Sequence, residues 1–132
     1  LFTGDTLFGA GCGRLFEGTA AQMAASLQKI SACGPQKKLY FGHEYTVTNL
    51  RFASQLAPQN RDIANRLEET IKKRNVGESS SPSSMSEELL TNPFLRCEDP
   101  EILDYLERNA GLKGRDPEEV FARIRLLRND FS

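Results

Sequence analysis

The chain has 132 residues with 17 Lys or Arg and 18 Asp or Glu, which gives a formal net charge of −1. This is about the length of one typical domain, and the charge gives no indication of a nucleic-acid or anionic-membrane partner. No apolar run approaches the roughly 20 residues that span a bilayer. The three cysteines, Cys12, Cys33 and Cys97, form no C-x-x-C pair, so we expect free thiols in a reducing compartment.

The first part of the chain alternates short apolar runs with glycine. Leu1–Thr3 is predicted to be the end of a buried strand, and the five glycines from Gly4 to Gly18 predict a loop, because glycine tolerates positive φ and close backbone approach. Thr19 is a suitable N-cap for a helix over Ala20–Ile30. Leu39–Phe41 is predicted to be a second short strand.

The remaining chain, from Thr46 onward, has the spacing of amphipathic helices. Ser84 with Glu87 fits a capping box, and an Asp-Pro pair opens each of the last two helices. The charged face of the helix predicted at Asp62–Arg74 is expected to be solvated. The serine-rich segment Gly77–Ser84 is expected to be a surface loop. The predicted helices are Thr46–Leu56, Asp62–Arg74, Met85–Leu90, one from Pro100 and one from Pro117.

Asp5 and His43 each follow a predicted strand end, and His43 is the only histidine. Carboxylate and imidazole groups on rigid strand ends are suitable metal ligands. Taken alone, however, Asp5 is more typical of a turn residue and His43 of a hydrogen-bonded loop residue. Two ligands cannot hold a catalytic metal alone, and the chain starts within an apolar run at Leu1. We therefore interpret it as the C-terminal part of a longer protein.

Three segments together closely resemble the hydroxyacylglutathione hydrolase (glyoxalase II) family: GDTLFGAGCGRLFEGT at 4–19, FGHEYT at 41–46 and NPFLR at 92–96. The resemblance covers essentially the whole chain. It implies an α/β fold class, in which residues 1–45 form the end of a metallo-β-lactamase αββα sandwich. Residues 46–132 then form an all-helical domain that binds the glutathione thioester.

The resemblance also implies a reaction. It is the hydrolysis of S-(2-hydroxyacyl)glutathione, such as S-D-lactoylglutathione, to a 2-hydroxy acid such as D-lactate and glutathione. The nucleophile is a hydroxide held between two divalent metal ions, which are expected to be Zn, with Fe or Mn also accepted. This reaction belongs to methylglyoxal detoxification. By the same resemblance, Asp5 matches the aspartate that bridges both metals, and His43 matches the last histidine ligand. The other ligands lie in a T-H-x-H-x-D-H motif and a further histidine upstream in the family, so the isolated chain is expected to be inactive.

Five residues match the family's glutathione-binding positions. Arg14 stands where several relatives carry Lys, and Phe16 stands where some carry Tyr, which removes a hydroxyl. The others are Tyr45 and the pair Arg125 and Arg128, for which the residues alone favour an ordinary solvated helix face.

Three further roles are expected. Cys12 is interpreted as a small residue in a tight turn rather than a nucleophile. Glu44 is expected to orient neighbouring loops or a ligand. Asn92-Pro93-Phe94 is expected to pack the helical domain against the sheet domain, whereas the glycine-rich segment is expected to be poorly held without its sheet neighbours.

The partner expected is the glutathione thioester, with no nucleic acid and no membrane. The full-length protein is expected to be a cytoplasmic monomer, with a mitochondrial or plastid location left open. Two alternatives also stay open, namely a non-catalytic glutathione-binding or regulatory relative and a persulfide dioxygenase of the same superfamily.

Overall fold

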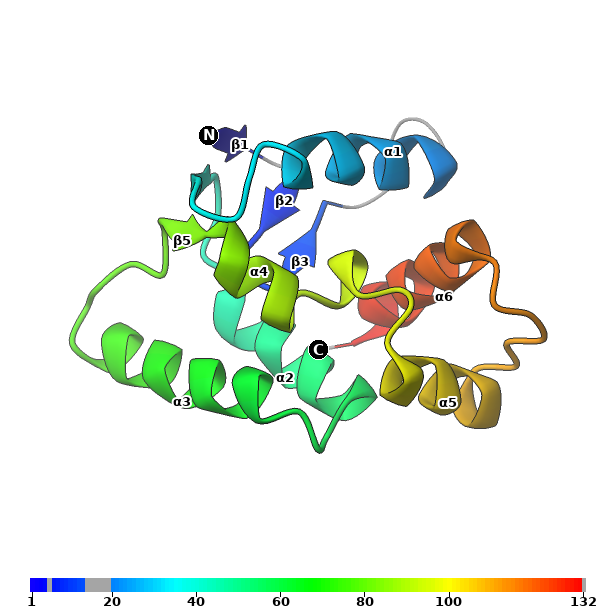
Figure 1. Ribbon diagram of the computed structural model, residues 1–132. Helices are drawn as coiled ribbons and strands as arrows, with labels where there is room; N and C mark the ends of the chain where they lie inside the picture. The colour runs from blue at the N-terminus through cyan, green and yellow to red at the C-terminus, as the bar shows by residue number, and fades with distance from the viewer. Residues whose placement is uncertain (5, 14–19, 132) are drawn as a thin grey trace.

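The structure, a computed structural model, describes residues 1–4, 6–13 and 20–131 (Figure 1). The described chain is mostly helical, and none of its helices has both the length and the apolar character required to cross a bilayer. The elements are β1 (Phe2–Gly4), β2 (Leu7–Phe8), β3 (Gly11–Cys12), α1 (Ala20–Ser31), β4 (Lys38–Phe41), α2 (Thr46–Leu56), α3 (Arg61–Asn75), β5 (Ser83–Ser84), α4 (Met85–Thr91), the 3-10 helix η1 (Pro93–Leu95), α5 (Pro100–Asn109) and α6 (Pro117–Asp130).

The strands form two small sheets. In the first, β4 lies between β1 and β5 and is parallel to β1 and antiparallel to β5. Parallel neighbours need a long crossover connection, and the segment between β1 and β4 contains α1. The second sheet is the antiparallel hairpin of β2 and β3. The predicted strands at 1–3 and 39–41 are therefore confirmed, but the expectation that the first is buried is wrong, because Phe2 is 91% exposed. β5 adds a short strand to the otherwise helical segment after residue 45.

The helices begin where their capping residues predict. Ser84 Oγ accepts a hydrogen bond from Glu87 N at 3.1 Å, and Asp99 Oδ1 accepts one from Glu101 N at 2.8 Å. These side chains satisfy backbone N–H groups that have no partner within the first turn of a helix. Proline occupies the first position of both α5 and α6, where its missing N–H costs nothing. The helix boundaries could be predicted because these signals are local.

The core lies where α2, α5 and α6 meet beneath the β2–β3 hairpin (Figure 1). Its helical members include Leu50 and Leu56 on α2, Ile102 and Leu106 on α5, and Val120 and Ile124 on α6. Leu7, Ala10 and Cys12 of the hairpin are buried in the same core. The glycine-rich start of the chain, as far as it is described, is therefore enclosed by the helices, which contradicts the expectation that it is poorly held.

Two predicted surface segments are partly buried. On the charged face of α3, Arg66 is only 5% exposed, so the expectation that this face is solvated is wrong at this position. In the serine-rich segment, Ser80 and Ser83 are buried. Arg66 and Ser83 are buried against Glu88 of α4. Ser80 is buried elsewhere, where it bonds Glu44 and Thr46. Local sequence reveals none of these contacts.

Candidate functional site

The β2–β3 hairpin is the framework of the candidate site. Leu7 pairs with Cys12 and Phe8 with Gly11, and Gly9-Ala10 connects the strands. Ala10 has φ of +57°, which is a left-handed conformation that L-residues rarely adopt. The glycines at positions 9 and 11 are required by close packing, because a Cβ at either position would overlap a side chain of α2. Cys12 was predicted to lie in a tight turn. In the structure the turn is formed by Gly9-Ala10, and Gly11–Cys12 is a strand.

Side chains from three helical regions bind the backbone of this hairpin. Each contact joins residues that are at least 40 positions apart in the sequence. The contacts are Asn49 Nδ2 to Gly9 O (3.0 Å), Ala10 N to Glu88 Oε1 (2.9 Å), Asn92 Nδ2 to Gly11 O (3.0 Å) and Arg125 Nη1 to Cys12 O (2.6 Å). Buried backbone groups must be paired, and here the helices supply the partners. Asn92 thus contacts the hairpin of this chain, while the expected packing of Asn92-Pro93-Phe94 against the sheet domain stays a prediction.

The open end of the hairpin leads to predicted site residues. Gly13 N donates to Thr6 O at 3.1 Å, which extends the hairpin pairing by one step. The next residues along the chain on either side are Asp5 and Arg14. Asp5, Arg14 and Phe16 lie outside the described residues, so their roles stay predictions.

His43 lies beside the hairpin in an aromatic cluster with Phe8 and Tyr45. Its ring stacks on Tyr45 with 5.3 Å between centroids and 6° between planes, and meets the edge of Phe8 at 5.8 Å. Phe8 also meets Tyr45 edge to face at 5.3 Å. Both His43 and Tyr45 are exposed, while Phe8 is buried. The structure therefore brings a predicted metal ligand and a predicted substrate-binding residue together at the surface next to the hairpin.

The described residues provide only some of the ligands that a metal ion requires. Within 1–4, 6–13 and 20–131, no group of three or more His, Cys, Asp and Glu side chains is placed to hold an ion. The exposed imidazole of His43 suits one ligand position. A metal site would need Asp5, which lies outside the described residues, and further ligands, so the metal site stays a prediction.

Glu44 fixes the loop that carries His43. Its carboxylate accepts hydrogen bonds from Ser80 N, from Ser80 Oγ at 2.7 Å and from Ser79 Oγ at 3.2 Å. Burial on its own would raise the pKa of Glu44, but the hydrogen bonds from Ser80 and Ser79 and the charge of Arg74 outweigh it, so that the pKa lies below its usual value. The expectation that Glu44 orients neighbouring loops is confirmed.

In the arginine pair of α6, Arg125 contacts the hairpin and Arg128 contacts Asn49 of α2. Arg125 is 4% exposed, and its Nη1 also donates to Gly13 O at 3.3 Å while its guanidinium lies 5.3 Å from the centre of the Phe94 ring. Arg128 is half-buried, and its Nε donates to Asn49 Oδ1 at 2.9 Å. Neither arginine lies on an ordinary solvated face, so the alternative that the residues alone favoured is wrong. Their roles in glutathione binding stay predictions.

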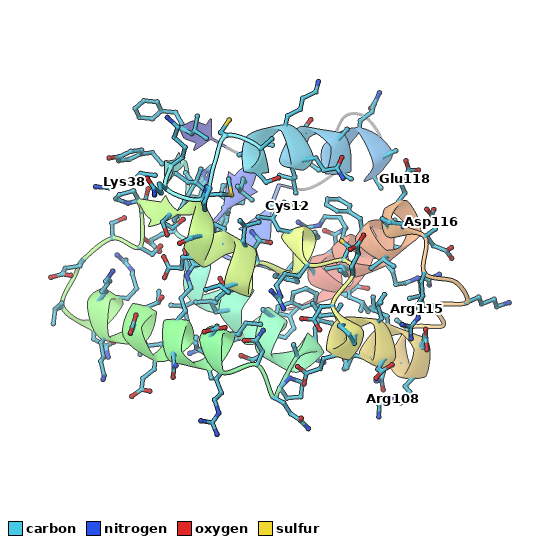
Figure 2. The ribbon with its side chains drawn as sticks, in the orientation of Figure 1. Cys12, Lys38, Arg108, Arg115, Asp116 and Glu118 are labelled. Atoms are coloured by element: carbon cyan, nitrogen blue, oxygen red, sulfur yellow. The ribbon has the colours of Figure 1, made fainter. Side chains whose placement is uncertain are left out.

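Cys12 is placed for packing rather than reaction. Burial raises the pKa of its thiol to about 11, although Arg125 and Arg128 oppose the shift. Figure 2 shows Cys12 among interior side chains, away from peripheral residues such as Arg108. A thiol with this pKa is almost entirely protonated near neutral pH and is a poor nucleophile, as predicted.

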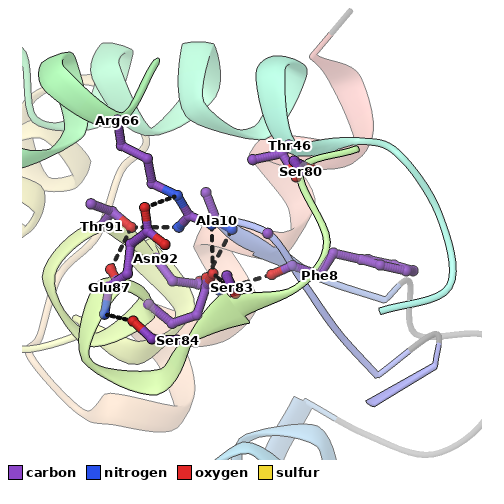
Figure 3. A network of polar contacts seen from close by, with 12 residues as sticks. Phe8, Ala10, Thr46, Arg66, Ser80, Ser83, Ser84, Glu87, Thr91 and Asn92 are labelled. Carbon is purple, nitrogen blue, oxygen red and sulfur yellow. Dashed lines mark hydrogen bonds and ion pairs between the residues drawn. The ribbon is translucent and has the colours of Figure 1, made fainter. Parts of the chain in front are cut away.

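A buried polar network, which the sequence does not predict, lies behind the hairpin (Figure 3). Glu88 is fully buried and forms a salt bridge with Arg66, with 2.7 Å between Oε2 and Nη2. Ser83 Oγ donates to the same carboxylate oxygen at 2.7 Å, and Arg66 Nη1 donates to Thr91 Oγ1 at 2.7 Å. No signal in the sequence separates Glu88 from its exposed neighbours, because the contacts depend on the tertiary fold.

A cavity of about 440 Å³ lies between α1, η1 and α6. Its described lining includes Leu27, Phe94 and Phe121, and the predicted site residues His43 and Tyr45 are not among it. We assign the candidate site to the surface beside the hairpin, because the predicted residues that are described gather there.

Comparisons with known proteins identify the family of this chain. The family model described as Hydroxyacylglutathione hydrolase C-terminus matches residues 44–131. The Hydroxyacylglutathione hydrolase of Methylobacillus flagellatus is 51% identical over 131 residues, which are 99% of this chain and 51% of the relative. Proteins of the same name from Nitrosomonas eutropha (47% over 134 residues) and Pseudomonas paraeruginosa (46% over 131 residues) also cover 99% of this chain and 51% of each relative. The chain thus spans about half the length of these relatives, and it belongs to the hydroxyacylglutathione hydrolase C-terminus family.

Proposed function

We propose that this chain is the C-terminal, glutathione-thioester-binding half of a hydroxyacylglutathione hydrolase. The substrate class is S-(2-hydroxyacyl)glutathione, such as S-D-lactoylglutathione, and the products are a 2-hydroxy acid and glutathione. The observation that carries the proposal is the similarity to enzymes of that name over 99% of the chain. The aromatic cluster that places His43 and Tyr45 beside the hairpin supports it.

A pair of divalent cations, Zn, Fe or Mn, would supply a hydroxide near neutral pH and polarise the thioester carbonyl. In this chain, Asp5 and His43 would hold the cations together with ligands from outside it. The imidazole of His43 is kept in place by stacking on Tyr45 and by the bonds of the adjacent Glu44 to Ser80. Such fixed supports reduce the reorganisation that ligand binding would otherwise require.

The remaining predicted residues would bind the glutathione part of the substrate, which carries carboxylates. Arg14 and Phe16 follow the hairpin in the sequence, and Tyr45 is exposed beside it. Arg125 and Arg128 would supply positive charge from α6, on the side of the hairpin where Arg125 already binds Cys12 O. Charge-assisted contacts of this kind favour a substrate with ionised carboxylates.

The test uses the complete polypeptide to which this chain is proposed to belong. We expect hydrolysis of S-D-lactoylglutathione, measured as loss of thioester absorbance, to disappear on chelation and to return with added Zn. We expect His43→Ala and Asp5→Ala to lose nearly all activity and part of the bound metal. Gln36→Ala, an exposed change before β4, is the matched control.

Wild-type turnover and metal content in either ligand variant would refute the assigned role. Glutathione binding without hydrolysis in the metal-loaded wild type would instead identify a non-catalytic relative.

A further inference from the structure

The serine-rich segment makes specific contacts with the part of the chain that leads from β4 into α2. The two run in opposite directions, because β5, at the end of the segment, pairs antiparallel with β4. The contacts, in order along the segment, are Ser80 Oγ to Glu44 Oε2 (2.7 Å), Phe41 N to Ser81 Oγ (3.3 Å), Ser83 opposite Leu39 and Ser84 opposite Lys38. A segment of low complexity therefore lies along the strand and loop that carry His43 and Tyr45.

Ser80 contacts this loop through both its backbone and its side chain. Ser80 N and Oγ donate to the Glu44 carboxylate, and Ser80 Oγ lies 2.6 Å from Thr46 Oγ1 (Figure 3). A hydroxyl has a single proton, so Thr46 donates to Ser80 and Ser80 donates to Glu44. Both Ser80 and Thr46 are buried, and a buried polar group that loses its partner is costly. The two hydroxyls and the carboxylate therefore form one connected unit.

The aromatic rings on either side of Glu44 have a second support in the hairpin. The buried ring of Phe8 meets His43 at 5.8 Å and Tyr45 at 5.3 Å. His43 and Tyr45 are exposed, and single contacts between aromatic rings contribute little. Loops with few buried contacts open locally at low cost in free energy. Because Glu44 lies between the two rings in the sequence, its hydrogen bonds to Ser80 restrain both of them.

We propose that Ser80 is a positioning residue, which holds the His43 imidazole against the Tyr45 ring through Glu44. The use of this arrangement for metal and substrate binding rests on the function proposed above. The arrangement itself involves only described residues and does not depend on that function. The two parts can therefore be tested separately.

The informative substitution is Ser80→Ala, which removes the hydroxyl and leaves only the Ser80 N–H to bond Glu44. The matched control is Ser86→Ala, the same change at an exposed serine whose described contact is with Ser84 Oγ at 3.4 Å. Glu44→Ala gives the upper limit of the effect, because it removes the hydrogen bonds to Ser80 and to Ser79 together.

The first measurement is the NMR spectrum of the imidazole in the 132-residue chain. His43 is the only histidine, so its two carbon-bound ring protons can be identified directly, and the stacked Tyr45 ring shifts their signals. The spectrum is recorded at about pH 8.5, above the range in which free histidine titrates. We expect Ser80→Ala to move these signals toward those of free histidine, part of the way that Glu44→Ala moves them, and Ser86→Ala to leave them unchanged. Equal signals in wild type and Ser80→Ala would overturn the proposal.

Two further variants separate positioning from stability, since Ser80→Ala also leaves the buried Thr46 hydroxyl without its partner. Thr46→Val removes that hydroxyl but keeps the bond from Ser80 to Glu44, so we expect the His43 signals to stay near their wild-type positions even if Tm falls. The double variant Ser80→Ala with Thr46→Val leaves neither hydroxyl unpaired, so we expect displaced His43 signals at a higher Tm than in Ser80→Ala. An equal displacement in Thr46→Val and Ser80→Ala would indicate general loosening and would overturn the proposal.

The last measurement is made in the complete polypeptide. Ser80→Ala is expected to lower Zn affinity or kcat by about tenfold, as is typical when a residue supporting a metal ligand is changed, and Ser86→Ala is expected to behave like wild type. A lowered Tm with unchanged kcat, KM and Zn affinity would show that Ser80 only stabilises the fold, and would overturn its role in the site. If the wild-type polypeptide hydrolyses no thioester, the proposed function fails, whereas the His43 signals still decide the role of Ser80.

Discussion

Replacing Arg66 with Met should destabilise the chain strongly, although a sequence reading places this arginine on a solvated face. The guanidinium is 5% exposed and contacts Glu88, Glu87 and Thr91. Met fills much of the same volume but leaves the buried Glu88 carboxylate without its counter-charge. Breaking a buried pair in this way costs about 3–5 kcal/mol, because the remaining charge stays desolvated. For a domain of this length, that corresponds to a fall in Tm of roughly 10–20 °C.

The assay is urea unfolding of the 132-residue chain followed by circular dichroism, with a thermal scan in parallel. Lys72→Met is the control, because Lys72 lies on the same helix and forms an exposed pair with Glu68 at 3.5 Å. Exposed pairs of this kind contribute at most about 1 kcal/mol. A loss in Arg66→Met as small as in Lys72→Met would refute the reasoning, since it would mean that Arg66 is solvated as the sequence suggested.

Other predictions concern the hairpin and the surrounding loops. Gly11→Ala should cost about 1–3 kcal/mol of unfolding free energy, because its Cβ would overlap a side chain of α2; an unchanged urea midpoint would contradict this packing. Cys12, with a pKa of about 11, should resist iodoacetamide at pH 8 in the native chain while the exposed Cys33 reacts, as mass spectrometry would show. The lowered pKa of Glu44 means that its stabilising contribution is present above the ordinary value of 4.5 and is lost as pH falls further. Glu44→Gln should therefore lower Tm by more at pH 7 than in acid, where the carboxylate is protonated. In the complete polypeptide, Arg125→Ala should raise KM more than it lowers kcat if the arginine binds substrate; a fall in kcat alone would assign it to holding the hairpin.

The helices could be predicted from the sequence because their signals are local. The stripe on α5 and the caps at Ser84 and Asp99 involve residues within one or two turns, so periodicity and capping identify them. The hairpin and β5 could not be predicted in the same way. A two-residue strand has too few positions to show alternation, and the residues of β5 pair with residues of β4 that are 44 and 46 positions away.

The residues of the site likewise include some that the sequence identifies and some that it does not. The sequence identified His43, Tyr45 and Glu44, and the structure brings the first two together and shows what the third holds. It could not identify Glu88, since helical spacing alone does not tell which carboxylate another element will cover. It also could not show that Arg125 is buried against the backbone of Cys12 and Gly13, a contact that spans more than a hundred residues.

The large sequence separation of the residues that contact the hairpin affects how the molecule folds. The bonds to Gly9, Ala10, Gly11 and Cys12 span 40, 78, 81 and 113 residues. Contacts of such separation are slow to form, because the intervening chain must first be ordered. During synthesis the turn at Gly9-Ala10 is made before α6, yet it is completely enclosed only once α6 has packed against it. The hairpin is therefore expected to acquire its final shape late, and loss of α6 should loosen it.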